Sequence, residues 1–159
     1  MEAVIFTGIQ ATGKSTFFKE RFFDTHVRIS LDLLRTRHRE RRLLHLCIEL
    51  CQPFVIDNTN PTAEERARYI VPARAAGFRV VGYYFRSNLV DSIARNAGRS
   101  GRAQVPVKGI GGTARRLQTP ALREGFDALY HVRIATDSRF IVEDWYDGAG
   151  AGDASTWGR

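Results

Sequence analysis

Cysteine is scarce in this sequence, and a long hydrophobic run is missing. Its two cysteines are Cys47 and Cys51. Because neither a second cysteine pair nor a histidine cluster stands near them, we interpret both as free thiols rather than as a metal site or a disulfide. No stretch approaches the roughly 18 consecutive apolar residues of a membrane span, and residues 1–4 lack the basic region of a signal peptide. We therefore expect a cytoplasmic protein with no membrane partner.

Lysine is also scarce, although the chain is basic. The 159 residues include 24 Lys+Arg against 17 Asp+Glu, a net charge of +7, and only Lys14, Lys19 and Lys108 are lysines, which leaves 21 arginines. The planar guanidinium of arginine suits bidentate contacts with phosphate, yet a biased genome would give the same composition. The hydrophobic share of 43% at this length predicts one folded domain and excludes a disordered chain.

Short apolar runs alternate with helical patterns along the chain. This alternation predicts an α/β fold in three layers, with a parallel central sheet flanked by helices. Strands are expected at residues 3–6, 26–29, 54–56, 78–85 and 130–134, and helices at residues 14–23, 31–51, 61–76 and 89–96.

The strongest motif is the octapeptide GIQATGKS at residues 8–15, which matches the phosphate-binding loop pattern G-x-x-x-x-G-K-S/T. An apolar run precedes it and a helical pattern follows it, as the motif requires. Its glycines let the backbone turn tightly, so that amide N–H groups converge on an anion at a helix N-terminus. We expect Lys14 to lie between the β- and γ-phosphates of ATP and the Ser15 hydroxyl to bind the bridging Mg²⁺. The predicted ATP-binding residues are Gly8, Ala11, Thr12, Gly13, Lys14, Ser15 and Thr16.

A D-x-x-R pair, Asp32 and Arg35, follows the second predicted strand. Loops at the carboxyl ends of neighbouring parallel strands gather around one crevice, so we expect Asp32 near the γ-phosphate site. A carboxylate there can accept a hydroxyl proton during phosphoryl transfer. Arg35, three residues on and expected on the same helical face, can hold an anionic acceptor. An Asp at this place is also a common helix N-cap, and that alternative stays open.

Four polar residues, Asp57 to Asn60, follow the third predicted strand. Asp57 takes the place of the Walker-B carboxylate, which helps to hold Mg²⁺, usually through water. The three residues after it can line an acceptor pocket. Asn60 is equally suited to cap the next helix, for which Thr62 and Glu65 offer an alternative capping box.

A fourth group, Arg95 and Arg99, leads into a segment rich in glycine and arginine at residues 98–116. This composition predicts a mobile basic loop rather than a core element. Arginines on a closing lid can stabilise the charge that spreads over a transferring phosphoryl group. A basic helix end that interacts with its own dipole is the simpler alternative.

These four motifs, in this order, resemble the kinase domain of the polynucleotide 5'-hydroxyl kinases, both the bacteriophage type and the kinase half of the DNA-repair kinase-phosphatases. The matching segments are GIQATGKST, the D-x-x-R pair, IDNTNP at residues 56–61 and the R-N-x-x-R pair. The resemblance implies a phosphate-loop kinase domain at residues 1–135, with an arginine-bearing lid at about residues 95–116. Residues 136–159 would then form a C-terminal extension that ends in a flexible tail.

The resemblance also implies a role for each matching residue. Asp32 would be the general base that activates the 5'-OH, and Arg35 would hold a phosphate of the nucleic-acid acceptor. Thr59 and Asn60 would lie beside the acceptor. Arg95 and Arg99 would contact the phosphates of ATP and, with Lys14, complete the catalytic set. The cofactors would be ATP and Mg²⁺, and the partners would be 5'-OH ends of DNA or RNA undergoing repair. The sequence contains no D-x-D-x-T phosphatase signature.

Two other functions remain open at this stage. A small-molecule kinase that acts on a nucleoside, sugar or antibiotic would use the same Asp32 and the same lid. A nucleotide-binding module without catalysis would keep the phosphate loop, but the D-x-x-R pair would then have no task. Oligomeric state, preference for DNA or RNA, and the choice of nucleotide donor are not encoded in these motifs.

Overall fold

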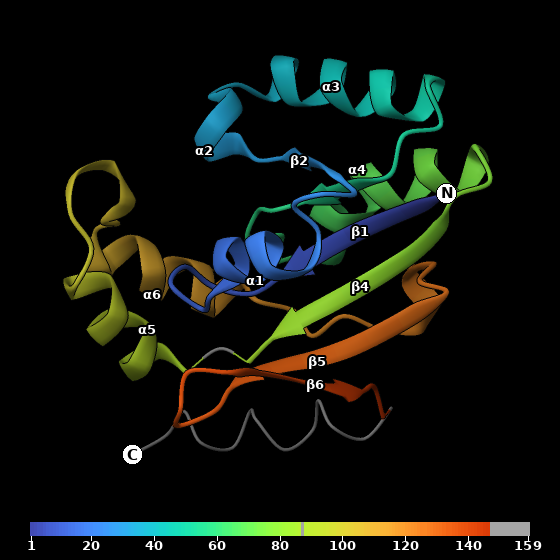
Figure 1. Ribbon diagram of the computed structural model, residues 1–159. Coiled ribbons are helices and arrows are strands. Elements are labelled where there is room, and N and C mark those ends of the chain that lie inside the picture. Colours follow the sequence, from blue (N-terminus) through green and yellow to red (C-terminus); the bar gives the residue numbers. More distant parts are fainter. Residues whose placement is uncertain (87, 147–159) are drawn as a thin grey trace.

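The computed structural model describes residues 1–86 and 88–146 and shows the predicted α/β fold in three layers (Figure 1). A six-stranded sheet has the order β2-β3-β1-β4-β5-β6, and its first five strands are parallel. Within the described residues, no helix is both long and apolar enough to span a bilayer. The elements are β1 (Glu2–Thr7), α1 (Lys14–Arg21), β2 (Val27–Ile29), α2 (Leu31–Leu34), α3 (Arg37–Glu49), β3 (Phe54–Ile56), α4 (Ala63–Ala75), β4 (Arg79–Phe85), α5 (Leu89–Ala97), η1 (Gly101–Ala103), α6 (Val107–Arg116), η2 (Leu122–Glu124), β5 (Ala128–Ile134) and β6 (Phe140–Asp144).

Alternate residues of the central strand β1 face two separate cores. Ala3 and Ile5 pack with side chains of α3 and α4 on one face of the sheet. Val4 and Phe6 pack with the aromatic residues of α1 on the other face. The strand is therefore buried on both sides, which is why its sequence is an uninterrupted apolar run.

Residues 31–51 are mostly helical, as predicted, but they form two helices, α2 and α3, rather than one. Arg35 adopts a left-handed φ of 71° and ends α2, and the Thr36 side chain then caps α3 by accepting a hydrogen bond from the Arg39 N–H group. Arg35 is thus the C-cap of α2 and does not continue the helical face on which Asp32 lies.

Two N-terminal caps were possible for the helix after β3, Asn60 or a capping box of Thr62 and Glu65. The structure shows the capping box, formed by Thr62 and Glu65 of α4.

The composition of segment 98–116 predicts a mobile loop without core contacts, and the structure contradicts this prediction. The segment contains η1 and the ten-residue helix α6, whose Ile110 is fully buried. Its glycines reduce helix propensity, but burial of Ile110 and packing against α5 outweigh that cost.

β6 was not predicted from the sequence. It pairs antiparallel with β5 within residues 136–159, and it brings Phe140 against the phosphate loop. The predicted tail from residue 147 onward lies outside the described residues.

Candidate active site

The carboxyl ends of the parallel strands bring the predicted site residues together. The phosphate loop follows β1, α2 follows β2, and Asp57 follows β3. The neighbours of β1 are β3 and β4, so the strand order changes direction beside the phosphate loop, which is where open α/β sheets bind ligands. The arrowheads of β1 and β4 point to the side of the molecule where α5 and α6 lie (Figure 1).

The phosphate loop ends at Gly13, which is the N-cap residue of α1. Gly13 has a left-handed φ of 91° and makes no side-chain cap, so the first N–H groups of α1 face the loop without an intrahelical acceptor. A Cβ atom at Gly13 would lie 2.8 Å from the Phe140 ring. Both the backbone conformation and the close approach of β6 therefore require glycine here. This geometry is that of an anion-binding helix terminus.

Lys14 is buried and points back into its own loop. Its Nζ donates to the Gly8 carbonyl at 2.8 Å and also to the Ile9 carbonyl. Burial lowers the pKa of Lys14 to about 8, Asp57 and Asp32 oppose this shift, and Arg99 adds to it. The predicted base, the predicted metal carboxylate and a lid arginine are thus all close enough to act on this ammonium.

Ser15 and Asp57 form a pair of oxygen donors beside the loop. Ser15 Oγ donates to Asp57 Oδ2 at 2.9 Å, and the described residues hold no cluster of three or more His, Cys, Asp or Glu side chains suited to a metal. Two hard oxygen donors fit Mg²⁺, which takes one or two protein ligands and completes its shell with phosphate and water. The donor chemistry of the predicted metal residues therefore fits the ion, while both oxygens contact the Arg28 guanidinium in this structure.

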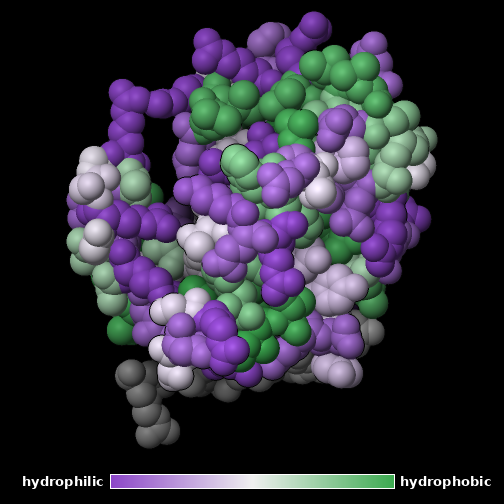
Figure 2. Space-filling model, viewed as in Figure 1, coloured by the Kyte–Doolittle hydropathy of each residue, from purple (hydrophilic) through white to green (hydrophobic). Residues whose placement is uncertain are grey.

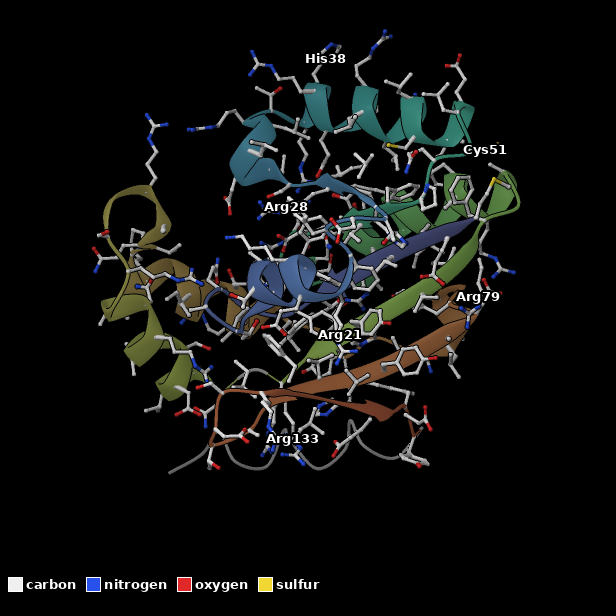
Figure 3. The ribbon with its side chains drawn as sticks, viewed as in Figure 1. Arg21, Arg28, His38, Cys51, Arg79 and Arg133 are labelled. Atoms are coloured by element: carbon white, nitrogen blue, oxygen red, sulfur yellow. The ribbon has the colours of Figure 1, made fainter. Side chains whose placement is uncertain are left out.

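Arg28 is a charged residue at this site that the sequence reasoning missed. Its Nε donates to Asp57 Oδ2 at 2.8 Å and its Nη2 to Ser15 Oγ at 3.0 Å, and its guanidinium lies over the Phe18 ring. Figure 3 shows Arg28 reaching from β2 toward α1. One feature of the sequence could have indicated Arg28 as a site residue: it is a charged residue within a short apolar strand that directly precedes Asp32.

Asp32 and Arg35 are both exposed, at the start and at the end of α2. Asp32 does not cap this helix: the cap position belongs to Ser30, whose side chain makes no cap hydrogen bond. The Leu31 N–H group instead donates to Asn58 Oδ1 at 2.9 Å. The alternative of Asp32 as an N-cap is therefore excluded, and its carboxylate remains available for chemistry.

Thr59 and Asn60 support the phosphate loop. The Thr59 carbonyl accepts from the Gly8 N–H group at 3.0 Å, and Asn60 Nδ2 donates to the Phe6 carbonyl at 2.8 Å. The Asn60 side chain is buried and does not cap α4. The expected contact of these two residues with the acceptor stays a prediction.

The predicted lid, at about residues 95–116, contacts the phosphate loop. Its Thr113 hydroxyl accepts from Gln10 of the phosphate loop at 3.1 Å. A hollow bordered by hydrophilic residues lies between part of this segment and the body of the molecule (Figure 2). Between α5 and β5 there is also a cavity of about 280 Å³. Its lining residues are Thr12, Arg86, Asn88, Asp91, Arg95, Val132, Arg133 and Ile134.

Comparisons with known proteins agree with the fold. A family model described as an AAA domain matches residues 4–120. The bifunctional polynucleotide phosphatase/kinase of Schizosaccharomyces pombe is 26% identical over 154 residues, which are 92% of this chain and 37% of that protein. The chain therefore spans little more than a third of this relative. The relative confirms the resemblance to the polynucleotide kinases that the four motifs indicate.

Two solved structures share the fold at low identity. Kti12 of Chaetomium thermophilum, in complex with ADP-AlF3, superposes with a TM-score of 0.62 at 14% identity and covers 86% of this chain and 92% of its own. The AvrRxo1-ORF1:-ORF2 complex with ATP superposes with a TM-score of 0.70 at 12% identity, over 93% of this chain and 61% of its own. At these identities the likeness establishes the fold alone.

Proposed function

The chain belongs to the AAA domain family, and we propose that this phosphate-loop kinase-like domain is an ATP- and Mg²⁺-dependent kinase that phosphorylates the 5'-OH end of DNA or RNA. The observation that carries the proposal is the grouping of the buried Lys14 and the Ser15–Asp57 pair at the carboxyl ends of β1 and β3, with Asp32 exposed on α2 directly after β2. A binding module needs the lysine and the metal carboxylate, but it has no use for a second, exposed carboxylate beside them. The relative named as a polynucleotide phosphatase/kinase supports the choice of acceptor, and the nucleotides held by the two solved structures support ATP as the donor.

In the proposed reaction the 5'-oxygen attacks the γ-phosphorus, its proton passes to Asp32, and the bond from the γ-phosphorus to the β,γ-bridging oxygen breaks to release ADP. Lys14 and Arg99 would stabilise the charge that spreads over the phosphoryl oxygens, and Arg95 would hold the donor phosphates at the lid. Ser15 and Asp57 would hold Mg²⁺, which would supply positive charge for the donor phosphates. The protein supplies positions and charges rather than covalent chemistry.

Exposed arginines extend from the acceptor side of the site along α2 and α3. Arg35 ends α2, and Arg39, Arg41 and Arg42 are exposed on α3. A nucleic-acid strand whose 5' end reaches Asp32 would pass along these residues, and its phosphates would displace counterions there. A neutral small acceptor would use none of them.

The test is transfer of labelled γ-phosphate from ATP to 5'-OH DNA, 5'-OH RNA and nucleosides, each at about 50 and about 200 mM salt. We expect phosphorylated oligonucleotides and a KM that rises with salt by roughly tenfold or more, because several phosphate contacts are lost. Asp32→Asn should abolish turnover and leave ATP affinity unchanged, whereas Asp24→Asn, an exposed acid after α1, should change neither.

Three outcomes would contradict this function. Transfer to nucleosides with no salt dependence would identify a small-molecule kinase. Intact ATP binding without transfer to any acceptor would identify a nucleotide-binding module. Full transfer by Asp32→Asn would remove this residue as the base.

A further inference from the structure

A polar cluster, made of the buried Glu40 and Tyr69 with the half-buried Asn58 and the exposed Arg37, adjoins the helix that carries the proposed base. Glu40 and Tyr69 are only 4% and 2% exposed. Asn58 Nδ2 and the Tyr69 hydroxyl both donate to Glu40 Oε1, at 2.6 and 2.9 Å, and Arg37 Nη1 donates to Glu40 Oε2 at 2.9 Å. A buried carboxylate needs such partners, so the cluster has one stable arrangement.

The cluster ends on the helix that carries Asp32. α2 has four residues, and Ser30 at its cap position leaves its buried hydroxyl without a hydrogen bond. Asn58 supplies the missing cap from another loop, because its Oδ1 accepts from the Leu31 N–H group at 2.9 Å. This contact lies next to Asp32 in the chain.

The orientation of the Asn58 amide follows from chemistry. A backbone N–H group requires an acceptor, and a carboxylate offers only acceptors. Oδ1 must therefore face Leu31, and Nδ2 must face Glu40. Burial, and after it the negative charge of Glu40, raises the pKa of Tyr69 to about 12, so Tyr69 keeps the proton that it donates.

We propose that Glu40 and Tyr69 are positioning residues for phosphoryl transfer, which act through Asn58 to fix α2 and with it the carboxylate of Asp32. The role in transfer rests on the proposed function, whereas the fixing of α2 does not. Neither Glu40 nor Tyr69 needs to touch a substrate for this role.

Two substitutions can exchange the hydrogen-bond donor at Asn58 with the acceptor at Glu40. In Asn58→Asp an oxygen replaces Nδ2 opposite the Glu40 carboxylate, and in Glu40→Gln an amide N–H group competes with the donors from Arg37 and Tyr69. In the double variant the amide introduced at position 40 can donate to one oxygen of the carboxylate introduced at position 58, while the other oxygen of that carboxylate still accepts from Leu31. The double variant therefore restores the connection with its polarity reversed and with the same total charge.

The experiment compares the wild type, both single variants, the double variant and Glu49→Gln, an exposed acid-to-amide control on the same helix α3. Each single variant should lower kcat on the order of 100-fold, as expected for a misplaced catalytic group, with KM for ATP unchanged. The double variant should recover kcat to within about tenfold of the wild type, because residues in one network couple strongly. Glu49→Gln should match the wild type.

Amide hydrogen exchange at residues 31–35 provides a measurement that needs no turnover. Exchange should be faster in both single variants and return toward the wild-type rate in the double variant. Unchanged exchange in the single variants would overturn the inference. A double variant whose kcat falls by the product of the two single-variant losses would overturn it as well. If exchange behaves as expected but the wild type transfers no phosphate, the proposed function fails while the fixing of α2 stands.

Discussion

At the scale of residues, burial and ion pairing of individual side chains control the charges at the site. Burial withdraws Lys14 from water and lowers its pKa to about 8, against 10.5 for an exposed lysine. Arg28 neutralises Asp57 directly at 2.7 Å. Lys14 and Arg28 are therefore two cations in different environments, one buried and titratable and one permanently charged.

The lowered pKa of Lys14 predicts a pH dependence of stability. Between pH 8 and 10.5 the unfolded chain binds a proton that the folded protein has lost, so the free energy of unfolding should rise with pH in this window. From about pH 7 to about pH 9.5 the gain should be about 2 kcal/mol. Urea unfolding at both pH values measures it. Lys14→Met should lack the gain and Lys19→Met, an exposed lysine of α1, should keep it; the same gain in Lys14→Met would contradict the assignment.

At the scale of elements, one buried side chain closes a turn of the proposed lid. Asn96 of α5 donates through Nδ2 to the Val105 carbonyl at 2.6 Å and accepts through Oδ1 from the Val105 N–H group at 2.8 Å. Asn96 is 3% exposed. This pair of hydrogen bonds closes the turn that contains Arg99 and fixes α6 relative to α5.

Removal of this contact should impair transfer without unfolding the protein. Asn96→Ala should lower kcat by roughly tenfold and change KM for ATP as well, because lid geometry affects both binding and turnover. Gln104→Ala, an exposed residue in the same turn, is the matched control and should leave both constants unchanged. Steady-state kinetics with 5'-OH oligonucleotides measure the effect. Equal kcat in Asn96→Ala and the wild type would show that the turn does not depend on Asn96.

At the scale of the whole molecule, Arg66 joins parts of the chain that are far apart in sequence. Its guanidinium is fully buried and binds both Glu124 oxygens, at 2.7 and 2.8 Å. Its Nη1 also donates to the carbonyls of Asn60, Pro61 and Gln118. One side chain thus connects α4, the loop after β3 and the segment that follows the lid.

Loss of this arginine should destabilise the whole fold. Arg66→Met should lower the free energy of unfolding by about 3–5 kcal/mol, since Glu124 would keep a largely buried charge without its partner. Arg74→Met removes the exposed ion pair with Asp127 and should cost about 1 kcal/mol or less. Urea unfolding measures both. Similar losses in the two variants would show that burial of the Arg66 pair adds nothing.

The sequence by itself determined the phosphate loop, the parallel α/β fold and the positions of Asp32 and Asp57. The loop consists of eight consecutive residues between a strand and a helix, so its geometry is local. Asp32 and Asp57 follow buried strands, and parallel strands bring their carboxyl ends to one edge of the sheet. Each of these conclusions needs short-range patterns and one general rule of topology.

Tertiary structure alone decided which side chains surround those residues. Arg28 meets Asp57, 29 residues away in the chain, Glu40 meets Asn58, 18 residues away, and Phe140 reaches Gly13 through a strand that the sequence did not indicate. The segment 98–116 folds as a helix for the same reason, because burial of Ile110 against distant residues outweighs the low helix propensity of its glycines. Contacts between distant residues depend on how helices pack on the sheet, and local sequence patterns carry no information about that packing.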